Sequence, residues 1–195
     1  MTNYDQTTLV RILAWMAVIS GIAAAFAGSP YSSHNGRIDV DALSRAVQHE
    51  DDHVTAVELA AWIRARRAGL RVIDVRAAPE YDAYHVPTAE RVSLDSIAHV
   101  PFRKDETIVL YSDGGAHAAQ AWVFLRALGY DRVRFLRGGL QDWLDDVMSP
   151  SLAPTASRRD SVAFDGNAAL SRYFGGVPRR GVTTATVQRV RRRGC

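Results

Sequence analysis

Six consecutive residues combine a hydroxyl, a carboxylate, two glycines and an imidazole in one short segment. They follow the apolar run Thr107–Tyr111, which reads as a buried strand, and lead into the helical run Ala118–Leu128. A strand, a tight loop and a helix N-terminus together present backbone N–H groups to an anion or a nucleophile. The sequence therefore predicts a functional loop made of Ser112, Asp113, Gly114, Gly115, Ala116 and His117.

Ser112 and His117 also suggest nucleophilic catalysis. His117 could accept the hydroxyl proton while Asp113 or another acid orients the ring, as in a serine-dependent hydrolase. However, both residues share one short loop, and the G-x-S-x-G pattern of a nucleophile elbow is missing. The simpler alternative is that Ser112 caps the loop and the helix by hydrogen bonds.

Four segments resemble, in order, the motifs of the rhodanese (sulfurtransferase) family. The loop resembles the C-x-x-G-x-R pattern, in which Gly115 matches while Ser112 and His117 replace the cysteine and the arginine. The other three segments are Val72–Arg76 with Pro79-Glu80-Tyr81, Tyr84–Ala89, and Leu128-Gly129-Tyr130 followed by Val133, Leu136, Gly138, Gly139 and Trp143.

The resemblance implies an α/β fold: one rhodanese-like domain with a parallel central sheet flanked by helices. It also implies that Ser112 occupies the position of the catalytic cysteine. A serine hydroxyl cannot form a persulfide and is far less acidic than a thiol, whose pKa is about 8.5. The expected function is thus a catalytically inactive binding or scaffold module, lacking the family's own reaction at Ser112.

Apolar runs alternate with helical or turn patterns from Leu70 onward, which independently indicates a parallel sheet with helices on both faces. The expected strands are 71–75, 91–94, 107–111 and 132–136, with helices near 116–128 and 139–147. Thr55 and Glu58 match a capping box that opens an earlier helix. In such sheets ligands bind beyond the carboxyl ends of the strands, where Ser112 falls.

Several charged and aromatic residues are expected to support the fold. Asp74 and Arg76 read as an ion pair at the end of the first long strand, His85 as a turn residue, and Trp143 as a core aromatic. The run His49–His53 consists of residue types that bind metal ions, but the sequence does not fix a third ligand beside its two histidines. Neither a metal nor a cofactor is expected.

The N-terminal segment is apolar. Ile12–Ala27 carries no charge, which is slightly short for a membrane span and slightly long for a signal-peptide core. An uncleaved anchor with the domain on the outer side is expected, and export after cleavage near Ala27 is the alternative. The expected organisation is an anchor or signal over 1–28, a linker with a short helix over 29–52, the domain over 53–148 and a tail over 149–195.

The tail is basic. Residues 151–195 hold nine arginines and two aspartates, a net charge of +7 in a chain of total charge +3. It is expected to be mostly flexible, and its partners are expected to be a membrane or exported protein and anionic lipid, not nucleic acid. The only cysteine of the chain, Cys195, is its last residue. This leaves an alternative function, in which Cys195 carries sulfur and the domain serves as its dock.

Overall fold

The computed structural model describes residues 6–26 and 39–181, apart from the side chains of 6–7 and 23–26. The chain divides into two units, Met1–Arg37 and Ile38–Cys195. The first contains helix α1 (Gln6–Phe26). Within the described part of the chain, no helix is long and apolar enough to cross a membrane. The expected transmembrane helix is therefore not supported, and the location of the domain stays a prediction.

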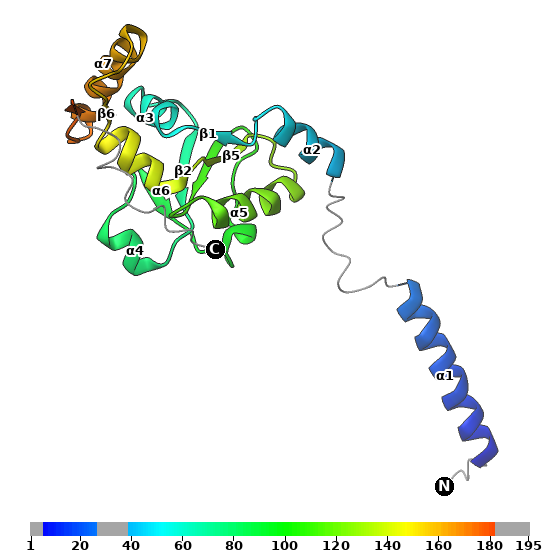
Figure 1. The fold of residues 1–195 in the computed structure, drawn as a ribbon. Coiled ribbons are helices and arrows are strands. Elements are labelled where there is room, and N and C mark those ends of the chain that lie inside the picture. Colours follow the sequence, from blue (N-terminus) through cyan, green and yellow to red (C-terminus); the bar gives the residue numbers. More distant parts are fainter. Residues whose placement is uncertain (1–5, 27–38, 182–195) are drawn as a thin grey trace. The chain divides into compact units, whose positions relative to one another are not determined.

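The second unit is built on a five-stranded sheet in the order β1-β5-β4-β2-β3 (Figure 1). Every pair of neighbouring strands is parallel. The strands are β1 (His53–Val54), β2 (Leu70–Asp74), β3 (Ala89–Arg91), β4 (Thr107–Tyr111) and β5 (Val133–Leu136). The predicted α/β fold with a parallel central sheet is confirmed, although β3 ends before most of the strand expected over 91–94, and the two-residue strand β1 was not anticipated.

Alternating side chains of the sheet build two separate apolar cores. In β4, Val109 and Tyr111 belong to one core, whereas Ile108 and Leu110 belong to the other. The first core is covered by α3 (Ala56–Arg64), α6 (Gly139–Asp142) and the π-helical turn η2 (Trp143–Met148), and the second by α5 (Ala116–Ala127) and the short η1 (Ile97–His99). Helices therefore cover both faces of the sheet, as the alternating pattern predicts.

Helix α3 begins with the capping box that the sequence predicts. The Glu58 N–H donates to the Thr55 hydroxyl at 3.2 Å, and the Thr55 N–H donates to the Glu58 carboxylate at 2.9 Å. These backbone and side-chain hydrogen bonds from Thr55 lower the pKa of Glu58. The remaining short helices are α2 (Val40–Gln48) and α4 (Ala78–Ala83). The cap fixes where α3 starts and hence how it lies on the sheet.

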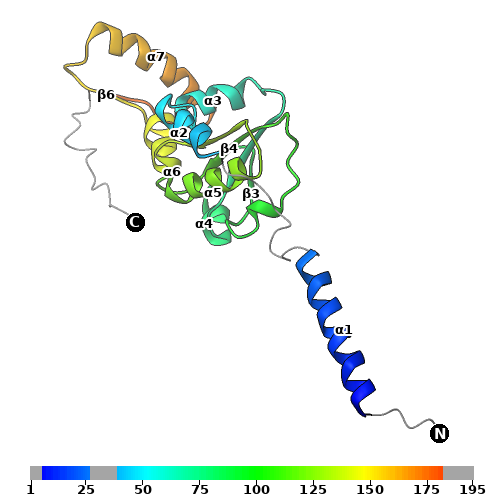
Figure 2. The same ribbon diagram turned by 90° about the vertical axis from the view of Figure 1, so that its right-hand side faces the viewer.

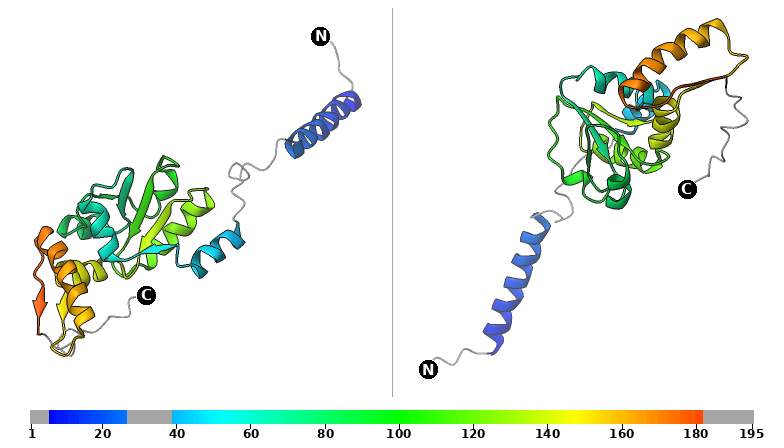
Figure 3. Two further views of the ribbon diagram at one scale, coloured as in Figure 1. Left: turned by 90° about the horizontal axis from the view of Figure 1, so that it is seen from above. Right: turned by 90° about the vertical axis from the view of Figure 1, so that its left-hand side faces the viewer.

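The region after residue 148 differs from the flexible tail expected there. It contains α7 (Arg158–Tyr173) and a small parallel sheet of β6 (Ser151–Leu152) and β7 (Arg179–Arg180), beside the helix in Figure 3. Helix α7 packs on α3 and η2 (Figure 2), and the Phe174 ring lies edge-on to Trp143 with centroids 5.3 Å apart. Buried Phe164 and Leu170 supply the apolar surface that orders this segment. Residues 182–195 lie outside the described part.

Candidate functional site

The loop Ser112–Gly115 joins the carboxyl end of β4 to the N-terminus of α5. Ser112 is only 3% exposed, and its Oγ accepts a hydrogen bond from the Ala118 N–H at 3.4 Å. Gly115 has a φ of +91°, which lets the chain turn sharply into the helix. Ser112 thus acts as a cap inside the first turn of α5, as the simpler sequence interpretation predicts. No hydrogen bond joins Ser112 to His117, so this structure does not assemble a Ser–His catalytic pair.

The backbone of this loop offers a group of unused donors. Within the described part of the chain, none of the N–H groups of residues 113–117 donates a hydrogen bond to a protein acceptor. Three of these groups belong to the loop and two to the first turn of α5, where N–H groups have no partner within the helix. N–H groups at a helix N-terminus stabilise negative charge. Within the described part of the chain, the loop therefore leaves five such backbone donors free.

Two backbone hydrogen bonds join the start of α6 to the Ser112 loop. The Leu140 N–H donates to the Ser112 carbonyl at 2.8 Å, and the Gln141 N–H donates to the Asp113 carbonyl at 3.1 Å. Gly139 lies so close to the loop that a Cβ atom there would overlap the Ser112 carbonyl oxygen and lie 2.7 Å from the Gly115 nitrogen. This close approach explains why α6 begins with a glycine, and it brings the loop and α6 into direct backbone contact.

Arg76 ties the loop to the end of β2. Its Nε donates to Asp74 Oδ1 at 3.0 Å and its Nη2 to Asp74 Oδ2 at 2.7 Å, while Nη1 reaches Asp113 Oδ1 at 3.2 Å. Nη2 also donates to the Tyr84 carbonyl at 2.7 Å. Burial by itself would lower the pKa of Arg76, but hydrogen bonds and charge from Asp74 raise it above its ordinary value. Arg76 thus stays charged, and its hydrogen bonds join three segments: the end of β2, the Ser112 loop and the turn at Tyr84.

Two tyrosine hydroxyls near the site accept hydrogen bonds from neighbouring segments. The Tyr111 hydroxyl accepts a hydrogen bond from the Val86 N–H at 3.0 Å, and the Tyr84 hydroxyl accepts one from Trp143 Nε1 at 2.9 Å. Burial raises the pKa of Tyr111, and the neighbouring Asp74 carboxylate raises it further. Tyr111 therefore stays neutral at physiological pH and serves as a structural hydrogen-bond acceptor.

A cavity of about 1280 Å³ opens above the loop. One wall carries Asp142, Asp145 and Asp146 from α6 and η2, which we call the acidic wall, and Asp113 and Glu80 also line the cavity. Burial raises the pKa of Asp146, and repulsion from Asp142 and Asp145 raises it further. Five carboxylates against two arginines, one of them Arg76, make this cavity acidic. The acidic wall was not anticipated from the sequence, although its i, i+3, i+4 spacing places three aspartates on one helix face.

The structure separates the remaining sequence candidates. His117 lines the cavity and is exposed. His85 does not line it; its ring stacks on Tyr81 with centroids 4.0 Å apart. Trp143 is fully buried beneath the site, and Cys195 lies outside the described residues. Among described residues, no three His, Cys, Asp or Glu side chains form a group that could hold a metal ion.

Comparison with known proteins agrees with this geometry. The family model for the rhodanese-like domain matches residues 55–146, which contain β2, β4, the loop and the acidic wall. A sulfurtransferase of Allochromatium vinosum is 33% identical over 87 residues, covering 43% of this chain and 78% of the relative. The chain belongs to the rhodanese-like domain family.

Two other proteins named as sulfurtransferases each match nearly half of the chain. The probable adenylyltransferase/sulfurtransferase MoeZ of Mycobacterium tuberculosis is 31% identical over 96 residues, which is 46% of this chain but only 24% of the relative. Among solved structures, the human single-domain sulfurtransferase TSTD1 is 26% identical with a TM-score of 0.43, covering 48% of this chain and 95% of that one. The similarity therefore concerns the domain, while α1 and the region after η2 lie beyond the matched family segment.

Proposed function

We propose that this protein handles sulfane sulfur, with the Ser112 loop as the binding site for a sulfur-bearing anion and Cys195 as the thiol that carries the sulfur. The observation that carries the proposal is the set of unused N–H groups at residues 113–117. The acidic wall beside them repels a free anion, and the four arginines of residues 182–195 offset this charge when they bring Cys195 to the loop. The names of the relatives, which are sulfurtransferases, favour this function over the inert scaffold expected first from the missing cysteine.

The chemistry assigned to Cys195 is a displacement at sulfur. Its thiolate attacks the outer sulfur of a sulfane donor such as thiosulfate, a new S–S bond forms, and the bond to sulfite breaks with its electron pair leaving on sulfite. The product is a persulfide anion on Cys195. The N–H groups of the loop are suited to stabilising such a terminal negative charge, which Ser112 cannot itself acquire.

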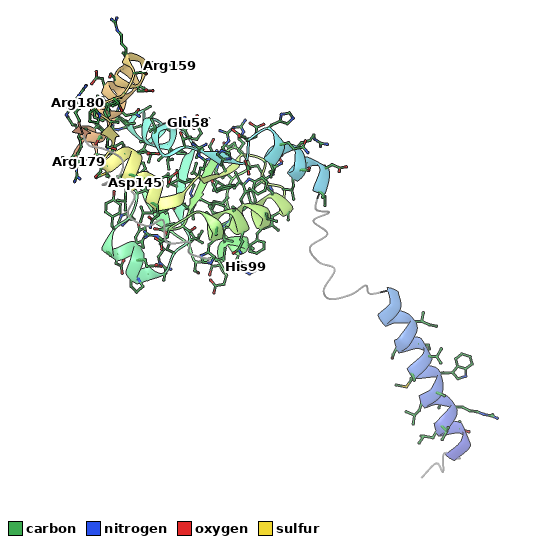
Figure 4. All side chains as sticks on the ribbon, viewed as in Figure 1. Glu58, His99, Asp145, Arg159, Arg179 and Arg180 are labelled. Atoms are coloured by element: carbon green, nitrogen blue, oxygen red, sulfur yellow. The ribbon has the colours of Figure 1, made fainter. Side chains whose placement is uncertain are left out.

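Charge complementarity supports the pairing of tail and site. Residues 182–195 contain four arginines and no acidic side chain, so the flanks of Cys195 are opposite in charge to the acidic wall. Two hydrogen bonds hold the last described strand, β7, next to the end of η2. The Val177 N–H donates to the Met148 carbonyl at 2.7 Å, and the Arg179 N–H donates to the Pro150 carbonyl at 2.8 Å. Met148 is the last residue of η2, which carries Asp145 and Asp146, and Figure 4 shows Asp145 and Arg179 at the same end of the domain.

The chain that follows β7 is long enough for Cys195 to reach the Ser112 loop. Cys195 is the fourteenth residue after Gly181, and an extended chain of that length spans about 45–50 Å. A compact unit of roughly 140 residues has a radius of gyration of only about 14 Å. The terminal thiol can thus reach the loop of its own chain without unfolding any described element.

The experiment is to incubate the full chain with thiosulfate and to follow persulfide on Cys195 by intact-protein mass spectrometry. We expect a mass increase of one sulfur atom, its absence in Cys195→Ser, and several-fold slower formation in the double variant Asp145→Asn/Asp146→Asn. Asp82→Asn, which removes an exposed carboxylate outside the cavity, is the matched control and should match the unaltered chain. An equal rate in the double variant would refute docking of the tail at the acidic wall.

A second candidate function is a binding module that carries no sulfur. It is favoured by one observation, the serine at the position of the family's nucleophile, held as a helix cap. Absence of any persulfide on Cys195, together with unchanged binding of a partner by Cys195→Ser, would select this function instead.

A further inference from the structure

A second cavity lies at the opposite edge of the sheet from the Ser112 loop. It has a volume of about 840 Å³, and five arginines line it: Arg45, Arg67, Arg126, Arg132 and Arg134. They come from α2, the turn before β2, the last turn of α5, and the beginning of β5. Residues distant in sequence thus bring one kind of charge to one cavity, which we call the arginine cavity.

Strand polarity keeps the arginine cavity apart from the sulfur site. Thr107, the first residue of β4, lines the arginine cavity, whereas Ser112 follows the last residue of the same strand. Arg132 directly precedes β5, and Arg67 stands three residues before β2. Because all strands are parallel, their amino ends share one edge and their carboxyl ends the other. In Figure 1, α2 and α6 accordingly lie at opposite ends of the domain.

The carboxylates in this cavity do not neutralise its arginines. Arg126 pairs with Asp131 at 3.1 Å, and Arg134 lies 4.0 Å from Asp51. These are the two carboxylates among the lining residues, so five guanidinium groups face two acids and leave an excess of three positive charges.

The other three guanidinium groups have no such partner. Arg132 donates to a backbone carbonyl, that of Asp105, at 3.1 Å. Arg45 and Arg67 have no carboxylate within 4.0 Å among the described residues. The Arg67 guanidinium carbon instead lies 4.2 Å from the centre of the Trp62 ring, which holds this charge in place by a cation–π contact.

Like charges that line one concave site repel one another, and water at the exposed side chains of Arg45, Arg67 and Arg132 screens this repulsion only in part. An anion that bridges the guanidinium groups removes the repulsion between them. Its oxygens also accept paired hydrogen bonds from the N–H groups of each guanidinium. The volume of the cavity suits a small molecule and not a protein loop.

We propose that the arginine cavity binds the pyrophosphate group of a small molecule. Two linked phosphates carry about three negative charges near neutral pH, which equals the excess of positive charge, and their oxygens are spread widely enough to meet several arginines at once. Free pyrophosphate and a nucleoside diphosphate share this chemistry, and the experiment distinguishes them.

The test is isothermal titration calorimetry of the full chain at about 0.1 M salt with pyrophosphate, with ADP, and with sulfate as a smaller anion. We expect saturable binding of one pyrophosphate and at least tenfold weaker affinity for sulfate. Tighter binding of ADP than of pyrophosphate would identify a nucleotide site, and equal or weaker binding of ADP would identify a site for the free anion.

Variants identify where the anion binds. Arg45→Ala/Arg67→Ala should weaken the affinity for pyrophosphate at least tenfold, and Asp131→Asn should strengthen it several-fold because it removes a repelling charge. Arg159→Ala is the matched control, since Arg159 is an exposed arginine on α7, outside the cavity. Absence of saturable binding up to millimolar concentration, or an equal loss in Arg159→Ala, would overturn the proposal. Persulfide formation on Cys195 is measured separately, so neither proposal depends on the other.

Discussion

Replacement of Gly139 by alanine tests the interlock between α6 and the Ser112 loop. Gly139 has a φ of +61°, and an added Cβ would overlap the Ser112 carbonyl oxygen and lie 2.5 Å from that of Asp113. Neither contact can relax by side-chain movement, because both partners are backbone atoms. The loop or the start of α6 must shift, and the two hydrogen bonds from Leu140 and Gln141 that join them are then lost.

The cost follows from these contacts. A left-handed backbone conformation at a residue with a side chain costs about 1–2 kcal/mol. Two lost hydrogen bonds cost about 1 kcal/mol each. The free energy of unfolding should therefore fall by about 3–4 kcal/mol. For a domain of this size each kcal/mol corresponds to roughly 3–5 °C, so the melting temperature should fall by roughly 9–20 °C.

The assay is thermal unfolding followed by circular dichroism, with two glycine controls. Gly114→Ala, in the same loop, should leave the melting temperature nearly unchanged, because nothing lies within 4 Å of its added Cβ and its φ is not positive. Gly175→Ala should show only the backbone cost, since its φ is +79° and its surroundings are open. A melting temperature of Gly139→Ala within a few degrees of the Gly175→Ala value would refute the interlock.

Three further changes test other parts of the site and fold. Asp74→Asn removes the buried carboxylate that pairs with Arg76 and leaves it only the exposed Asp113 as an ion-pair partner, so chemical denaturation should show about 3–5 kcal/mol lower stability; a loss below 1 kcal/mol would contradict the role of the pair. Ser112→Cys in a Cys195→Ser background should yield a thiol with a pKa below about 8.5, measured from the pH dependence of alkylation, because loop N–H groups favour the thiolate. An ordinary or raised pKa would exclude an anion-stabilising loop. Glu58→Ala should lower the melting temperature at neutral pH, where the ionised cap stabilises α3. Because the folded-state pKa of Glu58 is lowered, its contribution is complete above the unfolded pKa of about 4.3 and is lost as the pH falls through the folded value. The difference from the unaltered chain should shrink in that acidic range, and a difference independent of pH would show that the cap acts without its charge.

Local sequence patterns were sufficient for three strands of the central sheet, β2, β4 and β5, and for the position of the loop. The buried strand Thr107–Tyr111 alternates between two apolar cores, and the Thr55 capping box forms as its spacing predicts. Both depend on interactions between residues close in sequence, or on a regular alternation of apolar side chains. The region after residue 148 was misjudged because Phe164 and Leu170 are spread thinly among polar residues, and only packing on α3 and η2 makes them a core face.

The residue type at position 112 is enough to exclude a persulfide there, since a hydroxyl forms no persulfide in any fold. The surroundings of Ser112, in contrast, depend on how distant segments pack together. The acidic wall belongs to α6 and η2, and the arginine cavity draws on residues from Arg45 to Arg134. Each of these charged side chains, taken within its own segment, gives no indication of a binding site. Their charge becomes significant because the parallel sheet gathers strand beginnings at one edge and strand ends at the other, which sets distances that no local pattern encodes.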